Sequence, residues 1–285
     1  MLATFAAAQA QNTGVTRFVR FSHRGHTAQA IQEGDELKVI QGDMLGSYKV
    51  TSTKHKLSEV KLLYPITPSK ALAVGLNYKS HLGTRTPPSQ PEIFYKPITC
   101  LQNPGDPIRI PKDAKNVHYE GELVVVIGKR LSGVSPGEAA AGIFGVTCGN
   151  DVSERDWQNG PQKDLQWWRA KGADTFGPIG PYLVTKDDVP DPNNLAVHCS
   201  WGGETIAEDS TAYYNYPVHE TIAFMSRYHT LFPGDIISMG TAFKPSPGSK
   251  RSLHLADLNR YPRTVTMAIT GLGTLINPVE KVETA

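Results

Sequence analysis

Cysteine is scarce in this 285-residue sequence, which contains only three. Cys100, Cys148 and Cys199 form no Cys-x-x-Cys pair, so a thiolate zinc site is not expected. The odd number also argues against a disulfide framework. We expect the three thiols to act as small buried hydrophobic groups.

Long apolar runs and basic clusters are absent as well. No stretch approaches the ~18 apolar residues of a membrane span. Lys and Arg are dispersed, and the formal net charge is only +2 with the histidines neutral. We therefore expect neither a membrane nor a nucleic acid among the partners.

The first residues are small and apolar. Residues 2–11 read LATFAAAQAQ, and Ala8-Gln9-Ala10 is similar to a signal-peptidase site, although no basic segment precedes it. Residues 1–15 are interpreted as a disordered tail, with a signal-peptide remnant as the alternative. We expect a cytoplasmic location; the alternative is export to the periplasm, if Met1 lies inside a longer signal peptide.

Short apolar runs dominate the rest of the chain and predict mostly β structure with a few short helices. Residues 16–65 are predicted to form a small β-rich domain, with a half-buried strand at residues 17–21 and a second strand at residues 37–40. Residues 66–285 contain further runs of strand length, at residues 71–74, 123–127, 236–239 and 265–269.

Two helices are predicted. Ser135-Pro136-Gly137-Glu138 is a capping box with proline at the first helical position, so a helix should cover roughly residues 136–141. Apolar residues at helical spacing predict a second helix over residues 218–228.

Two glutamates precede the strongest apolar run. If His118-Tyr119-Glu120-Gly121-Glu122 belongs to one strand, its alternation places His118, Glu120 and Glu122 on one face. Two buried carboxylates side by side repel each other, and a hard divalent cation would relieve the repulsion. A solvent-exposed acidic strand end is the alternative. For His118, a position supporting the carboxylates and a plain surface position are both open.

Five polar motifs occur in a fixed order along the chain. They are Gly-Leu-Asn-Tyr-x-x-His at residues 75–81, Glu-x-Glu at 120–122, Asn-Asp-Val-Ser-x-Arg-Asp-x-Gln at 150–158, Lys-x-x-Asp-Thr-Phe-x-Pro-x-Gly-Pro at 171–181 and Gly-Asp-Ile-Ile-x-x-Gly-Thr at 234–241. One Glu-x-Glu is a weak signal, but the five together are specific. Over residues 66–277 the chain resembles the fumarylacetoacetate hydrolase superfamily.

The resemblance implies a fold and a metal centre. The fold is a mixed β-roll catalytic domain over residues 66–285, preceded by the small N-terminal domain, in a homodimer. Glu120, Glu122 and Asp151 match the ligands of one divalent cation, which would be Mg²⁺ or Mn²⁺, with Ca²⁺ as a further candidate.

The same resemblance assigns roles to four other residues. His81 would activate water or relay a proton, and Lys171 would stabilise negative charge near the substrate. Gln158 and Thr241 match substrate-contacting positions.

An enzyme acting on C–C bonds is implied. The expected reaction is hydrolytic cleavage of a C–C bond in an acylpyruvate-like 2-oxo acid through a metal-bound enolate. Oxaloacetate decarboxylation, keto–enol isomerisation and a ureidoglycolate-type lyase reaction on the same metal site are alternatives. A non-catalytic dicarboxylate-binding protein is the alternative from another class.

The sequence departs from the family pattern near the predicted site. Thr84 lies three residues after His81, where the family often has a partner glutamate, and Glu92 is the candidate replacement. Residues 83–90 are rich in Pro, Thr and Ser, so we expect His81 in a flexible, non-helical loop. Gly172 replaces a family serine, which is expected to enlarge the pocket. The tryptophans near the motifs, at positions 157, 167 and 168, are expected mainly to pack in the core or the lid.

Overall fold

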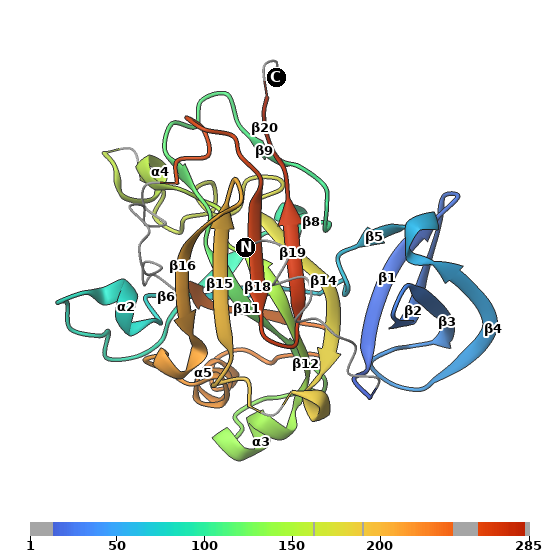
Figure 1. The fold of residues 1–285 in the computed structure, drawn as a ribbon. Coiled ribbons are helices and arrows are strands. Elements are labelled where there is room, and N and C mark those ends of the chain that lie inside the picture. The colour runs from blue at the N-terminus through green and yellow to red at the C-terminus, as the bar shows by residue number, and fades with distance from the viewer. Residues whose placement is uncertain (1–13, 162, 190, 242–255, 283–285) are drawn as a thin grey trace.

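The computed structural model describes residues 14–161, 163–189, 191–241 and 256–282 (Figure 1). These residues form a 12-stranded mixed sheet, a four-stranded sheet and two two-stranded ladders. The longest described helix has nine residues, and no described helix is long and apolar enough to cross a membrane. The prediction of mostly β structure with a few short helices is confirmed. Of the predicted N-terminal tail, residues 1–13 lie outside the described residues.

The elements are numbered in chain order. The strands are β1 (Arg17–His23), β2 (His26–Glu33), β3 (Glu36–Gly42), β4 (Tyr48–Lys56), β5 (Lys61–Leu63), β6 (Ala71–Gly75), β7 (Glu92–Lys96), β8 (Leu101–Gln102), β9 (Ile108–Ile110), β10 (Val117–His118), β11 (Gly121–Ile127), β12 (Ile143–Asn150), β13 (Ser153–Glu154), β14 (Gly177–Thr185), β15 (Ala196–Trp201), β16 (Glu204–Ser210), β17 (Ile236–Thr241), β18 (Val265–Ile269), β19 (Gly273–Asn277) and β20 (Val279–Lys281). The α-helices and 3₁₀ helices (η) are η1 (Leu57–Glu59), α2 (Lys79–Leu82), η2 (Ile98–Cys100), α3 (Pro136–Ala141), α4 (Arg155–Asn159), η3 (Lys186–Asp188), η4 (Thr211–Tyr213) and α5 (Val218–Ser226).

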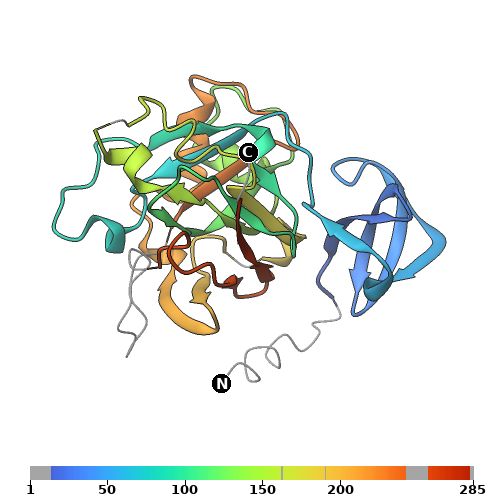
Figure 2. The same cartoon turned by 90° about the horizontal axis from the view of Figure 1, so that it is seen from above.

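Strands β1 to β4 form an antiparallel meander at one end of the large sheet, whose order is β4-β3-β2-β1-β14-β12-β11-β17-β6-β7. The β1–β2 turn consists of Arg24 and Gly25, both at positive φ (49° and 83°), which suits a two-residue hairpin. Because β1 also pairs with β14, the meander continues into the rest of the sheet. Figures 1 and 2 show residues 17–63 as a lobe at one side of the molecule, and we call them the N-terminal lobe.

The two strands predicted in the N-terminal lobe are present, but β2, β4 and β5 were missed. Residues 17–21 lie in β1 and residues 37–40 lie in β3. Residues 37–40 therefore belong to the third strand and not the second, because β2 lies between β1 and β3 in the chain. Strand β2 reads HTAQAIQE, and Ala30 is its one fully buried residue. Such a polar sequence lacks the apolar alternation that predicts a strand.

Strand β11 is the centre of the fold, and all seven of its residues are buried. Strands β12 and β17 pair along its two edges, and β15 and β18 of the four-stranded sheet contact it. A Cβ atom at Gly121 would lie 2.5 Å from Sγ of Cys199 and 3.0 Å from Sδ of Met267. Glycine at this position therefore permits the close approach of the two sheets. All three cysteines are buried and free, as predicted.

The two predicted helices are confirmed. In α3 the Ser135 hydroxyl accepts a hydrogen bond from the Glu138 amide, and the Glu138 carboxylate accepts one from the Ser135 amide, which completes the capping box. Helix α5 begins at Val218 as predicted and ends at Ser226, two residues before the predicted end.

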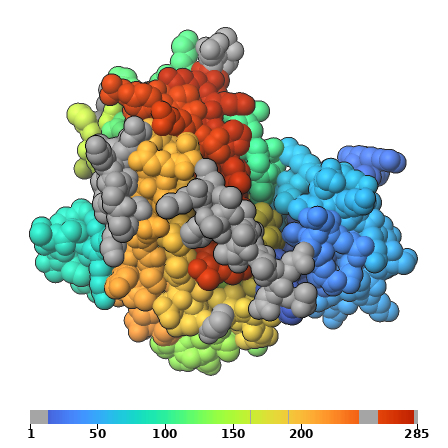
Figure 3. Space-filling model, viewed as in Figure 1, coloured from blue at the N-terminus to red at the C-terminus, as the bar shows by residue number. Residues whose placement is uncertain are grey.

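The segment that carries His81 differs from the prediction. His81 lies in α2, a four-residue helix in which its amide donates to the Tyr78 carbonyl, and Gly83 ends the helix at a φ of +58°. The expectation of a non-helical loop at His81 was therefore wrong, because one helical turn fits before Gly83. Residues 84–90 are non-helical, as their composition predicts. The segment between β6 and β7 protrudes at the edge opposite the N-terminal lobe (Figure 3).

Candidate metal centre

Three buried carboxylates meet where β11 begins and β12 ends. Each of Glu120, Glu122 and Asp151 offers an oxygen, and these oxygens all lie within 4.8 Å of one another. The antiparallel register pairs Gly121 with Asn150, so the residues flanking these two strand ends become neighbours. The structure thus brings together the three predicted ligands, and their oxygen atoms suit Mg²⁺, Mn²⁺ or Ca²⁺.

The strand that carries the glutamates is interrupted, which corrects the expected geometry. Strand β10 ends at His118 and β11 begins at Gly121, so Tyr119 and Glu120 lie between two ladders. The Glu120 amide donates to Oδ1 of Asn150 at 3.0 Å, and the Glu120 carbonyl accepts from the Asp151 amide at 2.9 Å. These two bonds fix Glu120 beside Asp151 without a continuous strand.

His118 is buried, so its interpretation as a plain surface residue was wrong. Its Nδ1 accepts a hydrogen bond from Nε of Arg155 at 3.3 Å, and the same guanidinium group donates to Oε1 of Glu120 at 2.5 Å. His118 therefore supports Glu120 through Arg155, a residue of the motif at positions 150–158.

Lys171 lies inside the carboxylate cluster. Its Nζ is 2.9 Å from Oε2 of Glu120 and 2.6 Å from Oδ2 of Asp151. It also donates to Oγ of Ser153 at 2.7 Å, and the residue is only 3% exposed. An ammonium group in this position can stabilise negative charge on a bound ligand, which is the role that the family resemblance implies.

Lys96 is a second buried ammonium group at the site, and sequence reasoning missed it. Its Nζ donates to Oδ1 of Asp151 and to the Lys171 carbonyl, and it lies 3.3 Å from the Phe176 carbonyl. A sequence signal existed, because the alternation of β7 places Phe94 and Lys96 on the same face. A lysine on an apolar strand face needs a buried partner.

The two glutamates have opposite electrostatic environments. Burial alone would raise the pKa of Glu120, but the charges of Arg155, Lys171 and His81 hold this pKa well below its usual range. For Glu122, burial and the neighbouring charges of Asp151 and Glu120 raise the pKa to about 8. The cluster therefore lacks positive charge at Glu122, and a divalent cation would supply it.

Glu122 is nevertheless held firmly on one side. Its Oε2 accepts hydrogen bonds from the Ser238 hydroxyl at 2.5 Å and from the Gly240 amide at 3.0 Å. Gly240 has a φ of +93°, and a Cβ atom there would lie 2.9 Å from Cβ of Asn77. This close approach explains why the Gly-Thr pair of the last motif begins with glycine.

The other predicted residues surround the cluster. Thr241 pairs with Glu122 in the β17–β11 register, and its hydroxyl donates to the Gly121 carbonyl at 3.3 Å. The Gln158 Oε1 accepts from Arg155 at 2.8 Å. Of the three residues, His81 is joined to the cluster by the effect of its protonated form, which lowers the pKa of Glu120. The roles of these three residues in binding and catalysis stay predictions.

Gly172 does not enlarge a pocket, contrary to expectation. A Cβ atom there would lie 2.2 Å from the Trp168 carbonyl oxygen and 2.5 Å from Cδ of Pro97. The space that a serine side chain would need is therefore filled by its neighbours.

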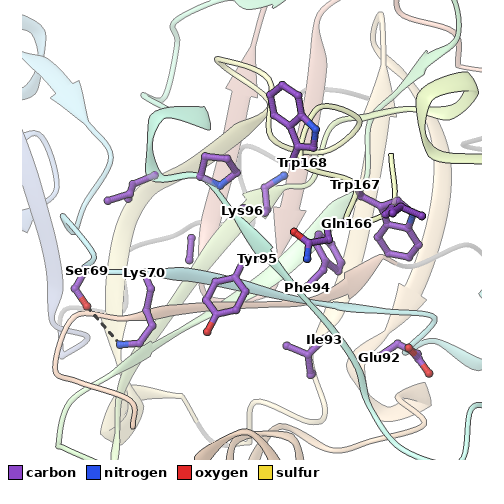
Figure 4. A pocket seen from close by; sticks show the side chains of 14 residues that line it. Ser69, Lys70, Glu92, Ile93, Phe94, Tyr95, Lys96, Gln166, Trp167 and Trp168 are labelled. Atoms are coloured by element: carbon purple, nitrogen blue, oxygen red, sulfur yellow. Dashed lines mark hydrogen bonds between the residues drawn. The ribbon is translucent and has the colours of Figure 1, made fainter. Parts of the chain in front are cut away.

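A cleft of about 640 Å³ runs along β7, the edge strand next to the site (Figure 4). Phe94 forms its inner wall, with Nζ of Lys171 5.2 Å from the ring centre and Trp167 packed edge-on at 5.3 Å. Trp157 is buried as expected, whereas Trp168 is 64% exposed and lines the cleft, so its assignment to packing was wrong.

Comparisons with known proteins agree with this geometry. Residues 70–280 match the family model "Fumarylacetoacetate (FAA) hydrolase C-terminal". The chain belongs to the fumarylacetoacetate hydrolase family. Residues 16–65 match a second model, "Rv2993c-like, N-terminal".

Several members of the fumarylacetoacetate hydrolase family are similar over much of the chain. Protein Rv2993c of Mycobacterium tuberculosis is 39% identical over 236 residues, which cover 82% of this chain and 84% of that protein. The mitochondrial oxaloacetate tautomerase FAHD2A of Bos taurus is 42% identical over 187 residues, which cover 65% of this chain and only 59% of that protein. The crystal structure of 2-hydroxyhepta-2,4-diene-1,7-dioate isomerase from Mycobacterium marinum has a TM-score of 0.80 at 35% identity, over 94% of this chain and 100% of that chain.

Proposed function

We propose that this member of the fumarylacetoacetate hydrolase family is a divalent-cation-dependent enzyme that interconverts the keto and enol forms of a small 2-oxo dicarboxylic acid. Oxaloacetate is the first candidate substrate. The observation that carries the proposal is the pair of buried ammonium groups, Lys96 and Lys171, in contact with the carboxylate cluster. The similarity to proteins named as a tautomerase and an isomerase supports it.

The charge of the site suits a dianionic ligand. Glu120, Glu122 and Asp151 carry three negative charges when ionised, and Lys96, Lys171 and Arg155 carry three positive charges in contact with them. A bound divalent cation would leave the site with an excess of two positive charges. A dicarboxylate would neutralise this excess in a buried, low-dielectric environment.

The reaction needs stabilisation of an enolate and transfer of one proton. A bound cation would polarise the 2-keto oxygen of the substrate. Burial lowers the pKa of Lys96, but the charge and hydrogen bond of Asp151 together with the charges of Cys100 and Glu122 raise it, so Lys96 remains an ammonium group that stabilises negative charge. His81 takes the proton from the substrate carbon and delivers it to the oxygen, so no proton is consumed overall.

Of the candidate reactions, tautomerisation requires the fewest catalytic groups. Hydrolysis requires an activated water molecule, and Thr84 stands where the family often has the glutamate that assists His81. Isomerisation requires only that one group carry the proton.

Hydrolysis of a C–C bond in a larger acylpyruvate-like acid is the second candidate. The family model that residues 70–280 match is named for a hydrolase, which supports this candidate. Decarboxylation and lyase cleavage share the same requirements for charge stabilisation.

One set of assays tests these alternatives. Freshly dissolved enol-oxaloacetate is mixed with protein plus Mg²⁺ or Mn²⁺, and the decay of enol absorbance and the formation of pyruvate are followed together. EDTA and Glu122→Gln serve as negative controls, and Lys54→Met, at an exposed ion pair with Glu36, serves as the matched control.

Each outcome points to a different function. Accelerated enol decay without pyruvate supports tautomerisation, whereas pyruvate formation indicates decarboxylation. If a parallel assay shows cleavage of an acylpyruvate, and the decay of enol-oxaloacetate is not accelerated, hydrolysis is supported. Calorimetric binding of oxalate without turnover of any of these acids would indicate a non-catalytic binding protein.

A further inference from the structure

The loop that carries His81 is bonded at both of its ends to one residue, Tyr216. At the start of the loop, the Tyr216 amide donates to Oδ1 of Asn77 at 2.9 Å, and Nδ2 of Asn77 donates to the Tyr216 carbonyl at 3.2 Å. At the end of the loop, the Tyr216 hydroxyl donates to the Pro88 carbonyl. A residue distant in the chain therefore closes the loop of residues 77–88, which we call the His81 loop.

Tyr216 is itself anchored to a helix. It directly precedes Pro217, and α5, most of whose residues are buried, begins at Val218. The Tyr216 carbonyl also accepts a hydrogen bond from the hydroxyl of Thr221, a fully buried residue of α5, at 3.3 Å. The Tyr216 hydroxyl thus ties Pro88 to the start of a buried helix.

Asn77 joins the start of the His81 loop to the metal centre. Its Nδ2 also donates to the Met239 carbonyl at 2.9 Å. The next residue, Gly240, donates its amide to Oε2 of Glu122 at 3.0 Å. Asn77 is only 1% exposed, so these contacts enclose its side chain. The first residue of the loop is therefore fixed beside one of the three predicted metal ligands.

Between its two ends the loop holds His81 in the single helical turn of α2. Nη2 of Arg85 donates to the His81 carbonyl at 2.9 Å. The Ser80 hydroxyl donates to Oδ2 of Asp209, in β16, at 2.6 Å. Residues 83–87 are exposed and contribute little packing. The position of the helix therefore depends on the bond that closes the far end of the loop.

We propose that Tyr216 is a positioning residue, which closes the His81 loop and thereby holds the imidazole of His81 in place for proton transfer. The inference rests on the function proposed above, in which His81 carries the proton. A loop that is already closed loses less conformational entropy when the substrate binds. The Tyr216 hydroxyl then contributes to the rate through His81 and not through the cation.

Tyr216→Phe tests the inference, because it removes the bond to Pro88 and keeps the backbone bonds to Asn77. Trypsin cleavage after Arg85, which is exposed in the loop, should accelerate, and kcat should fall. We expect each to change by about two- to threefold, so that together they give the three- to tenfold change in loop opening expected for about one hydrogen bond. Mn²⁺ affinity and the melting temperature should not change. Tyr213→Phe, at a 50% exposed tyrosine, is the matched control and should alter none of these quantities.

The same substitution in a His81→Ala background separates a positioning role from a merely structural one. If Tyr216 acts through His81, Tyr216→Phe should leave the residual kcat of His81→Ala unchanged while cleavage after Arg85 still accelerates. A further fall in kcat would overturn the inference, as would unchanged cleavage or unchanged kcat in the single variant. Cleavage requires no turnover, so faster cleavage of Tyr216→Phe, with wild type inactive on oxaloacetate, would support the closed loop and contradict the proposed function.

Discussion

The two regions of the large sheet are assembled in different ways. In the N-terminal lobe the strands β1 to β4 each pair with the next one along the chain, and β4 at the edge is exposed along almost its whole length. At the centre β11 pairs with β17, more than a hundred residues away, and is buried throughout. Local hairpins therefore build the lobe, whereas the site depends on distant segments and on buried charges that must balance.

The first way to sharpen this contrast is to remove a ligand from the centre. Glu122→Ala should abolish Mn²⁺ binding and activity, because one of three converging carboxylates is lost. The metal-free protein should stay folded, since the substitution also relieves repulsion from Asp151 and Glu120. Calorimetry measures Mn²⁺ binding, and circular dichroism measures whether the metal-free protein is folded. Retained Mn²⁺ affinity would contradict the assignment of Glu122 as a ligand.

His81 is proposed to transfer a proton and is not one of the three carboxylates of the cluster. His81→Ala should lower kcat by ~10²–10⁴-fold, the usual contribution of a proton-transferring group, and leave Mn²⁺ affinity nearly unchanged. Steady-state kinetics with calorimetry on the same samples measures both, and Glu92→Gln tests whether that carboxylate assists His81. An unchanged kcat for His81→Ala would mean that the cation and the two lysines suffice.

Removal of a buried ammonium group compares the two regions directly. Lys96→Met should lower the unfolding free energy of the metal-free protein by up to about 3–5 kcal/mol, because Asp151 would lose one of its two buried ammonium partners and keep only Lys171. Lys54→Met, which removes an exposed ion pair in the N-terminal lobe, should cost at most about 1 kcal/mol. Urea unfolding gives both values. Equal effects would mean that the buried pair is not important for stability.

The pH dependence of metal binding follows from Glu122, whose pKa is raised to about 8 without the cation. Below pH 8 this carboxyl group holds a proton that must leave before a cation binds. The apparent dissociation constant for Mg²⁺ should therefore fall by about tenfold per pH unit from pH 6 to pH 8 and become constant above pH 8. Calorimetry in buffers of different ionisation enthalpy counts the released proton. A constant affinity across this range would contradict the pKa.

The family resemblance also predicts a homodimer, which is tested by the molecular mass of the protein in solution. Light scattering at micromolar concentration should give twice the 31.1 kDa mass of one chain. A monomer mass at the same concentration would contradict it.

Sequence reasoning located the parts of the site that local patterns specify. The Glu-x-Glu pair, Asp151 and Lys171 were found because each lies in a motif of distinctive order, and the α3 helix was found because Ser135 and Glu138 form a local capping box. These features depend on residues close together in the sequence.

Features that depend on contacts between distant segments were missed. The partner of Lys96 is Asp151, which follows β12, a strand that pairs with neither β6 nor β7. The burial of His118 depends on Arg155, and the filled space beside Gly172 depends on Pro97. In each case the residue type and its sequence neighbours do not reveal the contact. The contact depends on a residue that is close only in the folded structure.

The contact between Gly121 and Cys199 has a consequence for how the family can vary. A methyl group at position 121 would occupy almost the same space as the sulfur at position 199, 2.5 Å away. The two positions therefore form one epistatic unit across the interface of the sheets. An alanine at position 121 therefore requires the side chains of Cys199 and Met267 to shift or to be replaced by smaller ones.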